Sequence, residues 1–342
     1  MSERRAEPPA EPTPADRLRD ELAAFIERET RSSVSITGFT ALPGGTIRHA
    51  WALDVEIATG ALAGRHRLIY LLDRGGKPLG SRLGREEEFR LLAAMHGAGV
   101  RVPRPYWQLG QGLILERVEG EVVGRRLLRE RAYEGVRPRL LEQFGAELAR
   151  IHAVPPDAVP GLPGSTGRDA ARAQLDEIER ELREGGEPHP ALELALRWLR
   201  PRTPATARVV IVHGDYRLGN VIVDPVQGLA AVLDWELAHL GDGGEDLGWM
   251  CLRYWGGVDY PGEPTLGPWE RFLDGYAAAS GWRLTPELAR YWQVFAHFRW
   301  GVVMLRQARR HLEGVERNVE LAAIGRRRAE VAWDLLRLLE ED

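Results

Sequence analysis

Two carboxylates and one amide stand in the sequence at points where apolar runs end. Asp215 and Asn220 belong to the polar run HGDYRLGN, which lies between two apolar segments, and Asp234 begins the run DWE directly after the apolar run LAAVL. A β hairpin would gather these oxygen atoms at one end, and such oxygen atoms are the ligands that Mg²⁺ prefers. Phosphoryl transfer uses this kind of site, because a metal spreads the charge of the phosphates while an aspartate orients the attacking hydroxyl and accepts its proton.

The elements that would position these residues follow from the spacing of the apolar residues. In the first 120 residues we expect a helix from about Ala15, then a β-rich region that contains one further helix. That second helix is expected over about 85–96, where Gly97 and Gly99 end it. Strands are predicted over 33–42, 50–58, 65–72, 105–109 and 112–118.

Beyond Gly120 the pattern becomes largely helical, with a short β interruption around the two polar runs. The fold class expected is therefore α+β, with a small β-rich lobe before a larger helical lobe. Helices are predicted over 138–153, 170–183 and 189–199, and strand-like segments over 209–212, 221–223 and 230–233.

Composition excludes several classes of protein. Of the 342 residues, 44% are hydrophobic and 28% are charged, which is the profile of an ordinary globular protein. A formal charge of −4 gives no sign of a nucleic-acid binder, which would need a concentrated basic face. No apolar run approaches the roughly 18 residues that cross a bilayer. Because Cys251 is the single cysteine, no internal disulfide can form, so we expect a cytoplasmic protein.

The ordered set of HGDxxxxN, DWE and GDGGEDLG resembles the catalytic region of the aminoglycoside phosphotransferase family, which includes choline-kinase-like and acyl-CoA-dehydrogenase-associated kinases. The run FGAELARIHAV (144–154) continues the likeness, and GDGGEDLGWMCLRYW is closest to the acyl-CoA-dehydrogenase-associated branch. This resemblance implies a protein-kinase-like fold of two lobes. We therefore expect a nucleotide-binding lobe over 15–118 and a helical catalytic lobe over 119–342, after a disordered leader over 1–14.

The resemblance also implies a reaction and its main residues. Asp215 would be the catalytic base that moves the γ-phosphate of ATP or GTP to a hydroxyl of a small molecule, and Asn220 and Asp234 would bind Mg²⁺. His213 is expected to be structural, and Asp246 is expected to accept hydrogen bonds from backbone N–H groups of the catalytic loop. The chain is expected to be a monomer or a homodimer.

In the first lobe the resemblance assigns the remaining nucleotide contacts. Gly44 and Gly45 stand between two expected strands, where backbone could approach phosphate without a Cβ in the way. Glu88 aligns with a helix glutamate that pairs with a phosphate-binding cation, and the other interpretation is a solvated charge run. Glu116 belongs to the expected hinge, whose backbone would hydrogen-bond the nucleotide base.

The third strand departs from the family pattern, because the register of RHRLIYLLDR leaves two residues for the phosphate-binding cation. One register places Leu71 there and the other places Arg74. If Leu71 is the equivalent, the cation would come from elsewhere, such as Arg48 or Arg67. Lys77, the only lysine in the chain, lies beyond the strand.

Two alternatives to a small-molecule kinase stay open. One is a nucleotide-binding pseudokinase or sensor module without transferase activity, suggested by the uncertain third-strand cation. The other is a true protein kinase, which is disfavoured because HGD stands where protein kinases carry HRD. An acceptor with an apolar portion is expected, because Trp255 and other aromatic residues follow the second polar run. The resemblance to the acyl-CoA-dehydrogenase-associated branch implies a hydroxyacyl thioester.

Overall fold

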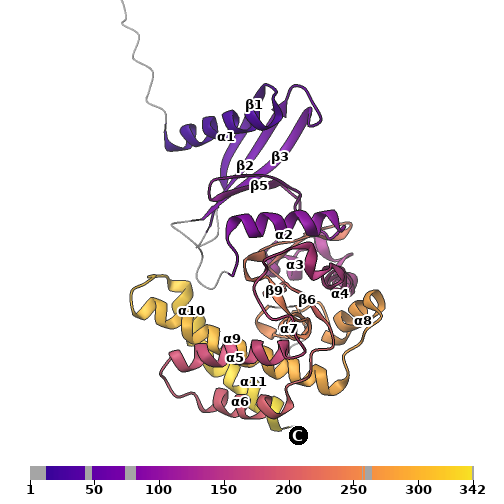
Figure 1. Cartoon of the computed structure of the whole chain (residues 1–342), viewed down its shortest axis with the longest axis vertical. Coiled ribbons are helices and arrows are strands. Elements are labelled where there is room, and N and C mark those ends of the chain that lie inside the picture. Colours follow the sequence, from indigo (N-terminus) through magenta and orange to yellow (C-terminus); the bar gives the residue numbers. More distant parts are fainter. Residues whose placement is uncertain (1–12, 43–47, 74–81, 256, 259–263, 341–342) are drawn as a thin grey trace, which may run out of the picture. The chain divides into compact units, whose positions relative to one another are not determined.

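The computed structural model describes residues 13–340 apart from 43–47, 74–81, 256 and 259–263 (Figure 1). The leader expected at 1–14 lies outside the described residues except for its last two.

The chain divides into two compact units. Unit 1 comprises residues 1–79 and 104–117, and unit 2 comprises residues 80–103 and 118–342. The second predicted helix thus belongs to unit 2 by its contacts, although the sequence placed it in the first lobe. The division into functional lobes at residue 118 stays a prediction.

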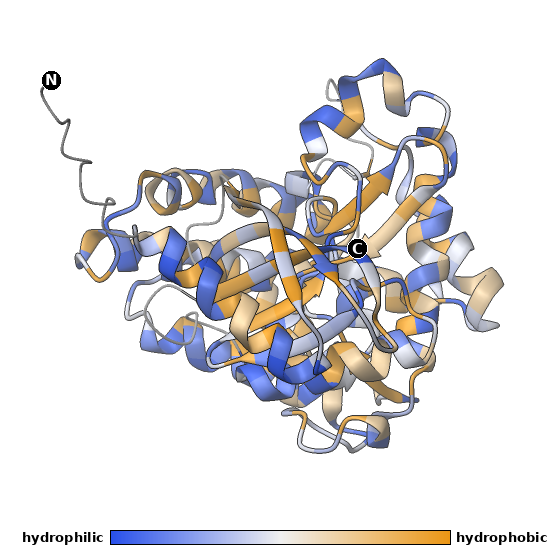
Figure 2. Ribbon diagram, turned by 90° about the horizontal axis from the view of Figure 1, so that it is seen from above, coloured by the Kyte–Doolittle hydropathy of each residue, from blue (hydrophilic) through white to orange (hydrophobic). Residues whose placement is uncertain are grey.

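Unit 1 is a five-stranded antiparallel sheet with one helix against it (Figure 1). Its elements are α1 (Pro14–Thr30), β1 (Val34–Leu42), β2 (Arg48–Ile57), β3 (Gly64–Asp73), β4 (Pro105–Leu109) and β5 (Gly112–Glu116). The strand order is β1-β2-β3-β5-β4. Leu22, Phe25 and Ile26 of α1 pack into the same buried cluster as Leu53 and Leu68 of the sheet. Figure 2 shows hydrophobic residues concentrated along these strands. The five predicted strands are confirmed.

Unit 2 is mainly helical, as predicted, and it contains two separate two-stranded antiparallel sheets. One sheet pairs β6 with β9 and the other pairs β7 with β8. The sequence did not predict β9. The elements of unit 2 are α2 (Arg85–Gly97), α3 (Gly124–Arg129), α4 (Arg137–Ala153), α5 (Ala170–Glu184), α6 (Pro190–Arg202), β6 (Val209–Val212), β7 (Val221–Asp224), β8 (Gly228–Val232), β9 (His239–Asp242), α7 (Gly244–Trp249), α8 (Trp269–Ser280), α9 (Pro286–Leu312), α10 (Val319–Arg326) and α11 (Arg328–Glu340).

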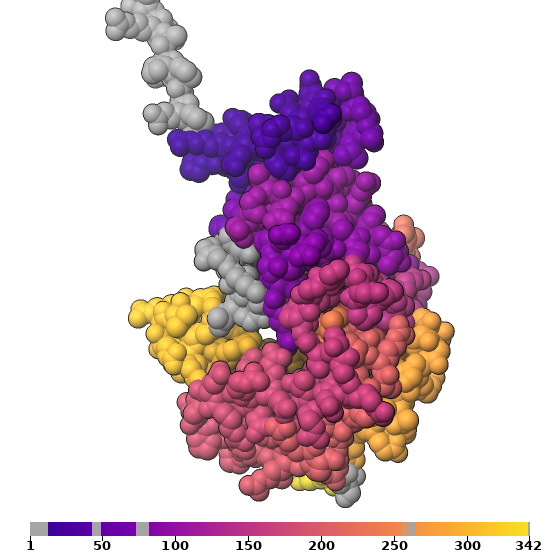
Figure 3. All heavy atoms as spheres, viewed as in Figure 1, coloured from indigo at the N-terminus to yellow at the C-terminus, as the bar shows by residue number. Residues whose placement is uncertain are grey.

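Glycines let the helices of unit 2 approach closely. A Cβ on Gly145 of α4 would lie 2.1 Å from a backbone oxygen of α8, and a Cβ on Gly248 of α7 would lie 2.3 Å from a backbone oxygen of α9. The long helix α9 therefore lies directly against α7, which follows the polar runs. Figure 3 shows the surfaces of α5 and α6 (rose) beside the C-terminal helices (yellow).

The α+β fold class is confirmed by this succession of an antiparallel sheet and a helical region. None of the described helices combines the length and apolar character that crossing a bilayer requires.

Candidate active site

The hairpin of β7 and β8 brings the two expected metal ligands to the same end. Val221 pairs with Val232 in the last pair of the hairpin, so Asn220 and Asp234 lie just beyond it. The backbone N–H of Leu233 donates to the carbonyl of Asn220 at 2.8 Å. The structure therefore places Asn220 opposite the residue that precedes Asp234.

The loop over 213–220 connects β6 to β7 and depends on two glycines. Gly214 and Gly219 have φ angles of +83° and +108°, which other residues adopt only at a cost. A Cβ on Gly214 would in addition lie 2.7 Å from the backbone oxygen of Leu237. These glycines fix the path of the loop and hence the position of Asp215.

Three side chains hold the carboxylate of Asp215. Nδ2 of Asn220 donates to Oδ2 at 2.6 Å, and Nε1 of Trp249 donates to Oδ1 at 2.8 Å. Nε of Arg217 donates to both oxygens, at 3.0 and 3.1 Å. The Asp215 side chain is 16% exposed. Two carboxylate oxygens offer about four acceptor positions, and these donors make four contacts with them, so a substrate hydroxyl would replace one of the two contacts of the Arg217 N–H.

The sequence did not predict Trp249 and Arg217 as partners of Asp215. Arg217 is two residues away in the same loop, so its charge was the one local signal available. Its guanidinium lies 4.8 Å above the ring of Trp255, and the rings of Trp249 and Trp255 are 5.4 Å apart. Asp215 therefore faces an aromatic surface that carries one positive charge.

Asp246 of α7 holds the start of the same loop from below the surface. Its Oδ2 accepts the backbone N–H of His213 at 2.7 Å, and its Oδ1 accepts that of Gly214 at 2.9 Å. Nε2 of the buried His152 lies 3.2 Å from Oδ2. Asp246 is itself fully buried. The expectation that Asp246 accepts backbone N–H groups of this loop is confirmed.

His213 is a structural residue in this arrangement, as expected. Its Nδ1 accepts the backbone N–H of Asp215 at 3.2 Å, so the ring proton is assigned to Nε2, which donates to the carbonyl of Leu233 at 2.9 Å. The ring is fully buried and packs 4.6 Å from that of Trp235. His213 thus ties the loop to the end of the hairpin.

A second buried ion pair supports the loop from α9. Arg299 donates to the carbonyl of Gly214 at 2.7 Å and lies 3.2 Å from Glu245. Its guanidinium also lies 4.1 Å above the ring of Trp249. Burial raises the pKa of Glu245, but His239 and Arg299 outweigh this effect and hold that pKa well below its ordinary value.

Asn220 and Asp234 could supply oxygen ligands to a metal ion. Because Nδ2 of Asn220 donates to Asp215, its Oδ1 lies on the other side of the amide group and remains an acceptor. Asp234 has a left-handed backbone with φ of 65°, which turns the chain sharply from β8 into Trp235. Among the described residues, no three His, Cys, Asp or Glu are grouped to hold a metal. One amide and one carboxylate fit Mg²⁺, which takes its remaining ligands from water and phosphate.

Glu88 is a buried residue of α2 rather than part of a solvated charge run. The segment before α2 is bonded to the Asp234 loop, because the backbone N–H of Arg82 donates to the carbonyl of Glu236 at 2.8 Å. Glu88 is 5% exposed and pairs with Arg85, which is equally buried. For Glu88 the interpretation as a solvated charge is therefore wrong. Its expected pairing with a phosphate-binding cation stays a prediction.

The remaining predicted nucleotide contacts belong to unit 1. Gly44, Gly45 and Arg74 lie outside the described residues, as does Lys77. Leu71, the alternative to Arg74, lies in β3 opposite residue 113 of β5. The choice between these two registers therefore stays open.

Glu116 ends β5, as the hinge interpretation requires. Its backbone N–H donates to the carbonyl of Arg104 at 2.8 Å, and its exposed side chain accepts the N–H of the same residue at 3.3 Å. Leu68 of β3 pairs with it across the sheet. The role of its backbone in base recognition stays a prediction.

Comparison with known sequences identifies relatives of this region. The model of the phosphotransferase enzyme family (APH) matches residues 64–292. Acyl-CoA dehydrogenase family member 10 of Mus musculus is 27% identical over 290 residues, which cover 73% of this chain and 25% of that protein. The chain thus spans about a quarter of the length of this curated relative.

Comparison with solved structures identifies the fold. A Ralstonia eutropha protein assigned as an aminoglycoside phosphotransferase superposes with a TM-score of 0.69 at 20% identity, covering 93% of this chain and 98% of that one. The GDP complex of aminoglycoside 2′-phosphotransferase-IIIa gives a TM-score of 0.56 at 14% identity, covering 95% of this chain and 97% of that one. The expected kinase-like fold of this family is confirmed.

Proposed function

Because the chain belongs to the phosphotransferase enzyme family and is a small-molecule phosphotransferase, we propose that it moves the γ-phosphate of ATP or GTP to a hydroxyl group of its acceptor. One observation carries this proposal. The carboxylate of Asp215 is held by three donors, yet it stays partly exposed beside the amide of Asn220.

Asp215 is the base in this proposal. One of its oxygens receives the hydrogen bond of the substrate hydroxyl in place of an Arg217 contact, and then the proton. The hydroxyl oxygen bonds to the γ-phosphorus as the bond from that phosphorus to the bridging oxygen of the nucleotide breaks. Asn220, Trp249 and Arg217 keep the carboxylate oriented, so that little reorganisation accompanies the proton transfer.

Asn220 and Asp234 hold Mg²⁺ in this proposal. When bound, the ion neutralises charge on the phosphates and fixes their position. The hairpin β7–β8 keeps the two ligand residues together through the hydrogen bond between residues 233 and 220. The left-handed backbone of Asp234 orients its side chain at the end of β8.

The donor nucleotide is assigned to the residues that the sequence predicts for it. Gly44 and Gly45 would cover the phosphates, Arg74 would contact them, Glu88 would support the phosphate-binding cation, and the backbone at Glu116 would bind the base. GDP in the structure of a protein of this fold supports a nucleotide as donor.

The acceptor is proposed to carry an apolar and an anionic portion, as a hydroxyacyl thioester does. Two observations support this class. Trp255 and Trp249 form an aromatic surface next to Asp215, and Arg217 adds a positive charge there.

The experiment compares wild type with Asp215→Asn. Each protein is incubated with magnesium and ATP or GTP, together with hydroxyacyl-CoA thioesters and aminoglycosides, and phosphorylated products are detected by mass spectrometry. Nucleotide binding is measured by calorimetry. Product from wild type alone, with equal nucleotide binding by both, supports the proposal. Magnesium-dependent binding without transfer to any acceptor supports the rival, a nucleotide-binding pseudokinase.

A further inference from the structure

A cavity of about 270 Å³ lies in unit 2 at the end of the β6–β9 ribbon that is remote from Asp215. Val209 pairs with Asp242 at this end, and Val212 pairs with His239 at the other. The loop with Asp215 begins after Val212, about 10 Å along the strand. None of the residues that line the cavity belongs to the candidate active site.

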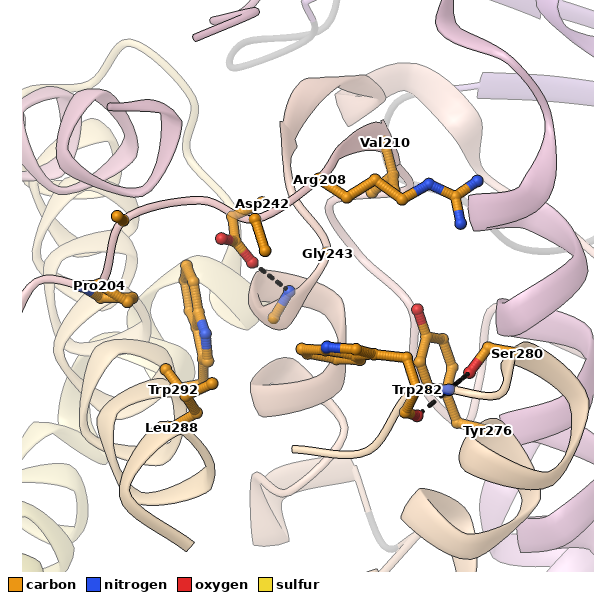
Figure 4. Close-up of a pocket in the computed structure, with 13 residues that line it drawn as sticks. Pro204, Arg208, Val210, Asp242, Gly243, Tyr276, Ser280, Trp282, Leu288 and Trp292 are labelled. Carbon is orange, nitrogen blue, oxygen red and sulfur yellow. Dashed lines mark hydrogen bonds between the residues drawn. The ribbon is translucent and has the colours of Figure 1, made fainter. Parts of the chain in front are cut away.

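Aromatic rings form two walls of the cavity (Figure 4). Trp292 of α9 lies on one side, and Trp282, which follows α8, lies on the other next to Tyr276. The rings of Tyr276 and Trp282 are 6.1 Å apart and nearly perpendicular. Trp292 is 1% exposed and Trp282 is 38% exposed, so one wall is fixed in the core and the other stands at the mouth. Such walls suit a flat ring.

The indole N–H of Trp292 is a donor at this wall. No group in the described part of the chain accepts a hydrogen bond from it. Gly244 lets the indole pack against the backbone, because a Cβ there would lie 2.0 Å from Nε1. In Figure 4 the nitrogen lies on the cavity side of the ring. An acceptor on a ligand in the cavity could therefore pair with this N–H.

Asp242 supplies the complementary acceptor. Burial raises the pKa of its carboxyl group. The hydrogen bonds from the backbone N–H of Gly244, at 2.9 Å, and from the Thr206 side chain, together with the charge of His152, only partly oppose this. Arg208 also lines the cavity, but its guanidinium donates to the carbonyl of His152 at 3.1 Å. In Figure 4 it points away from Asp242. Arg208 is therefore not the partner of this carboxylate.

We propose that this cavity binds a small planar heterocycle, which stacks on Trp282, presents N–H donors to Asp242 and offers an acceptor to the Trp292 N–H. An edge with two adjacent N–H groups matches a carboxylate. The volume of the cavity suits a ring system of one or two rings.

The cavity is connected to the loop that carries Asp215. The hydroxyl of Tyr276 lies 2.9 Å from Nδ1 of His152, and Nε2 of that ring lies 3.2 Å from Asp246. Asp246 in turn accepts the backbone N–H groups of His213 and Gly214. A ligand beside Tyr276 therefore contacts the first member of a hydrogen-bonded chain that ends at the catalytic loop. Occupancy of the cavity is proposed to stabilise that loop, which makes the cavity an effector site.

The binding test uses the full chain and 2-aminoquinazolin-4-one, a planar probe with an N–H edge and a carbonyl acceptor, measured by calorimetry. We expect one probe per chain, and at least tenfold weaker binding to Trp282→Ala and to Asp242→Asn. Asn keeps an acceptor for the Gly244 N–H. Trp333→Ala is the matched control, because Trp333 is 59% exposed on α11 and lines no part of the cavity. Thermal unfolding shows that each variant is folded.

Two results would overturn the site. One is the absence of binding to the wild type at about 1 mM probe, where even weak ligands bind. The other is undiminished binding to both cavity variants. Hydrogen exchange tests the connection, since the probe should slow exchange over residues 213–215 in wild type and not in Trp282→Ala. Unchanged exchange in a probe-saturated wild type would refute the effector role.

Discussion

The loop over 213–220 and helix α7 each contribute one aspartate to the same site, and the two carboxylates differ in what binds them. Asp246 is fully buried and accepts two backbone N–H groups. Asp215 is partly exposed and is bound by side chains. Backbone partners cannot turn away while the loop stays folded, whereas side chains can make room for a substrate. The partners of Asp246 therefore suit a supporting role, whereas those of Asp215 suit a carboxylate that reacts.

The largest expected effect follows from replacing the exposed carboxylate. Asp215→Asn should lower the transfer rate by about 10²–10⁴-fold, the range typical of a lost general base, and should change the unfolding temperature little. Product formation and thermal unfolding measure the two quantities. Asp274→Asn, an exposed aspartate in α8 that pairs with Arg283, is the control. Retention of most of the activity would show that Asp215 is not the base.

Replacing the buried carboxylate of Asp246 should, in contrast, lower the stability of the fold. Asp246→Asn should lower the free energy of unfolding by about 3–5 kcal/mol, because it breaks a buried charged network and leaves one of the two backbone donors without its acceptor. Urea denaturation measures this change. If the variant were as stable as the wild type, the supporting role would be wrong and the comparison would fail.

Lowering the pH should weaken the stabilisation that ionised Glu245 contributes behind the loop. The folded-state pKa of Glu245 is held below its ordinary value of 4.5, so the ionised group contributes stability above pH 4.5 and loses it as the pH falls through the folded-state value. Glu245→Gln should be less stable by about 2 kcal/mol at pH 7. The gap in unfolding temperature should narrow below pH 4.5, and a gap independent of pH would contradict this assignment.

The smallest effect is expected at Arg217. Its side chain is 28% exposed, so solvent screens its charge. Arg217→Met should lower kcat/KM by about tenfold, roughly the contribution of one exposed charge-assisted hydrogen bond, without altering the unfolding temperature. Arg217→Lys should recover part of the loss with an anionic acceptor. Equal activity of all three proteins would remove Arg217 from the site.

Much of the fold and the polar groups of the site could be predicted because their signals are local. The hairpin that joins Asn220 to Asp234 follows from two short apolar runs, and the strands of unit 1 follow from alternation. The strand β9, by contrast, reads HLGD and has no β-branched or aromatic residue. Only pairing with β6, about thirty residues earlier, makes it a strand.

Contacts between distant segments account for the other features that the sequence did not predict. Trp249 donates a hydrogen bond to Asp215, which lies 34 residues earlier in the sequence. The spacing of apolar residues does not predict such a bond. The helix over 85–97 was predicted correctly, but its place in unit 2 depends on the bond between Arg82 and Glu236. Periodicity shows which face of a helix is buried, not which neighbour covers it.

The left-handed backbone at Asp234 has a practical consequence for the design of an inactive variant of this protein. Asparagine tolerates that backbone nearly as well as aspartate, whereas alanine and glutamate resist it. Asp234→Asn would therefore remove one negative charge while the turn keeps its shape. Such a variant offers a way to trap a nucleotide and an acceptor together for crystallography.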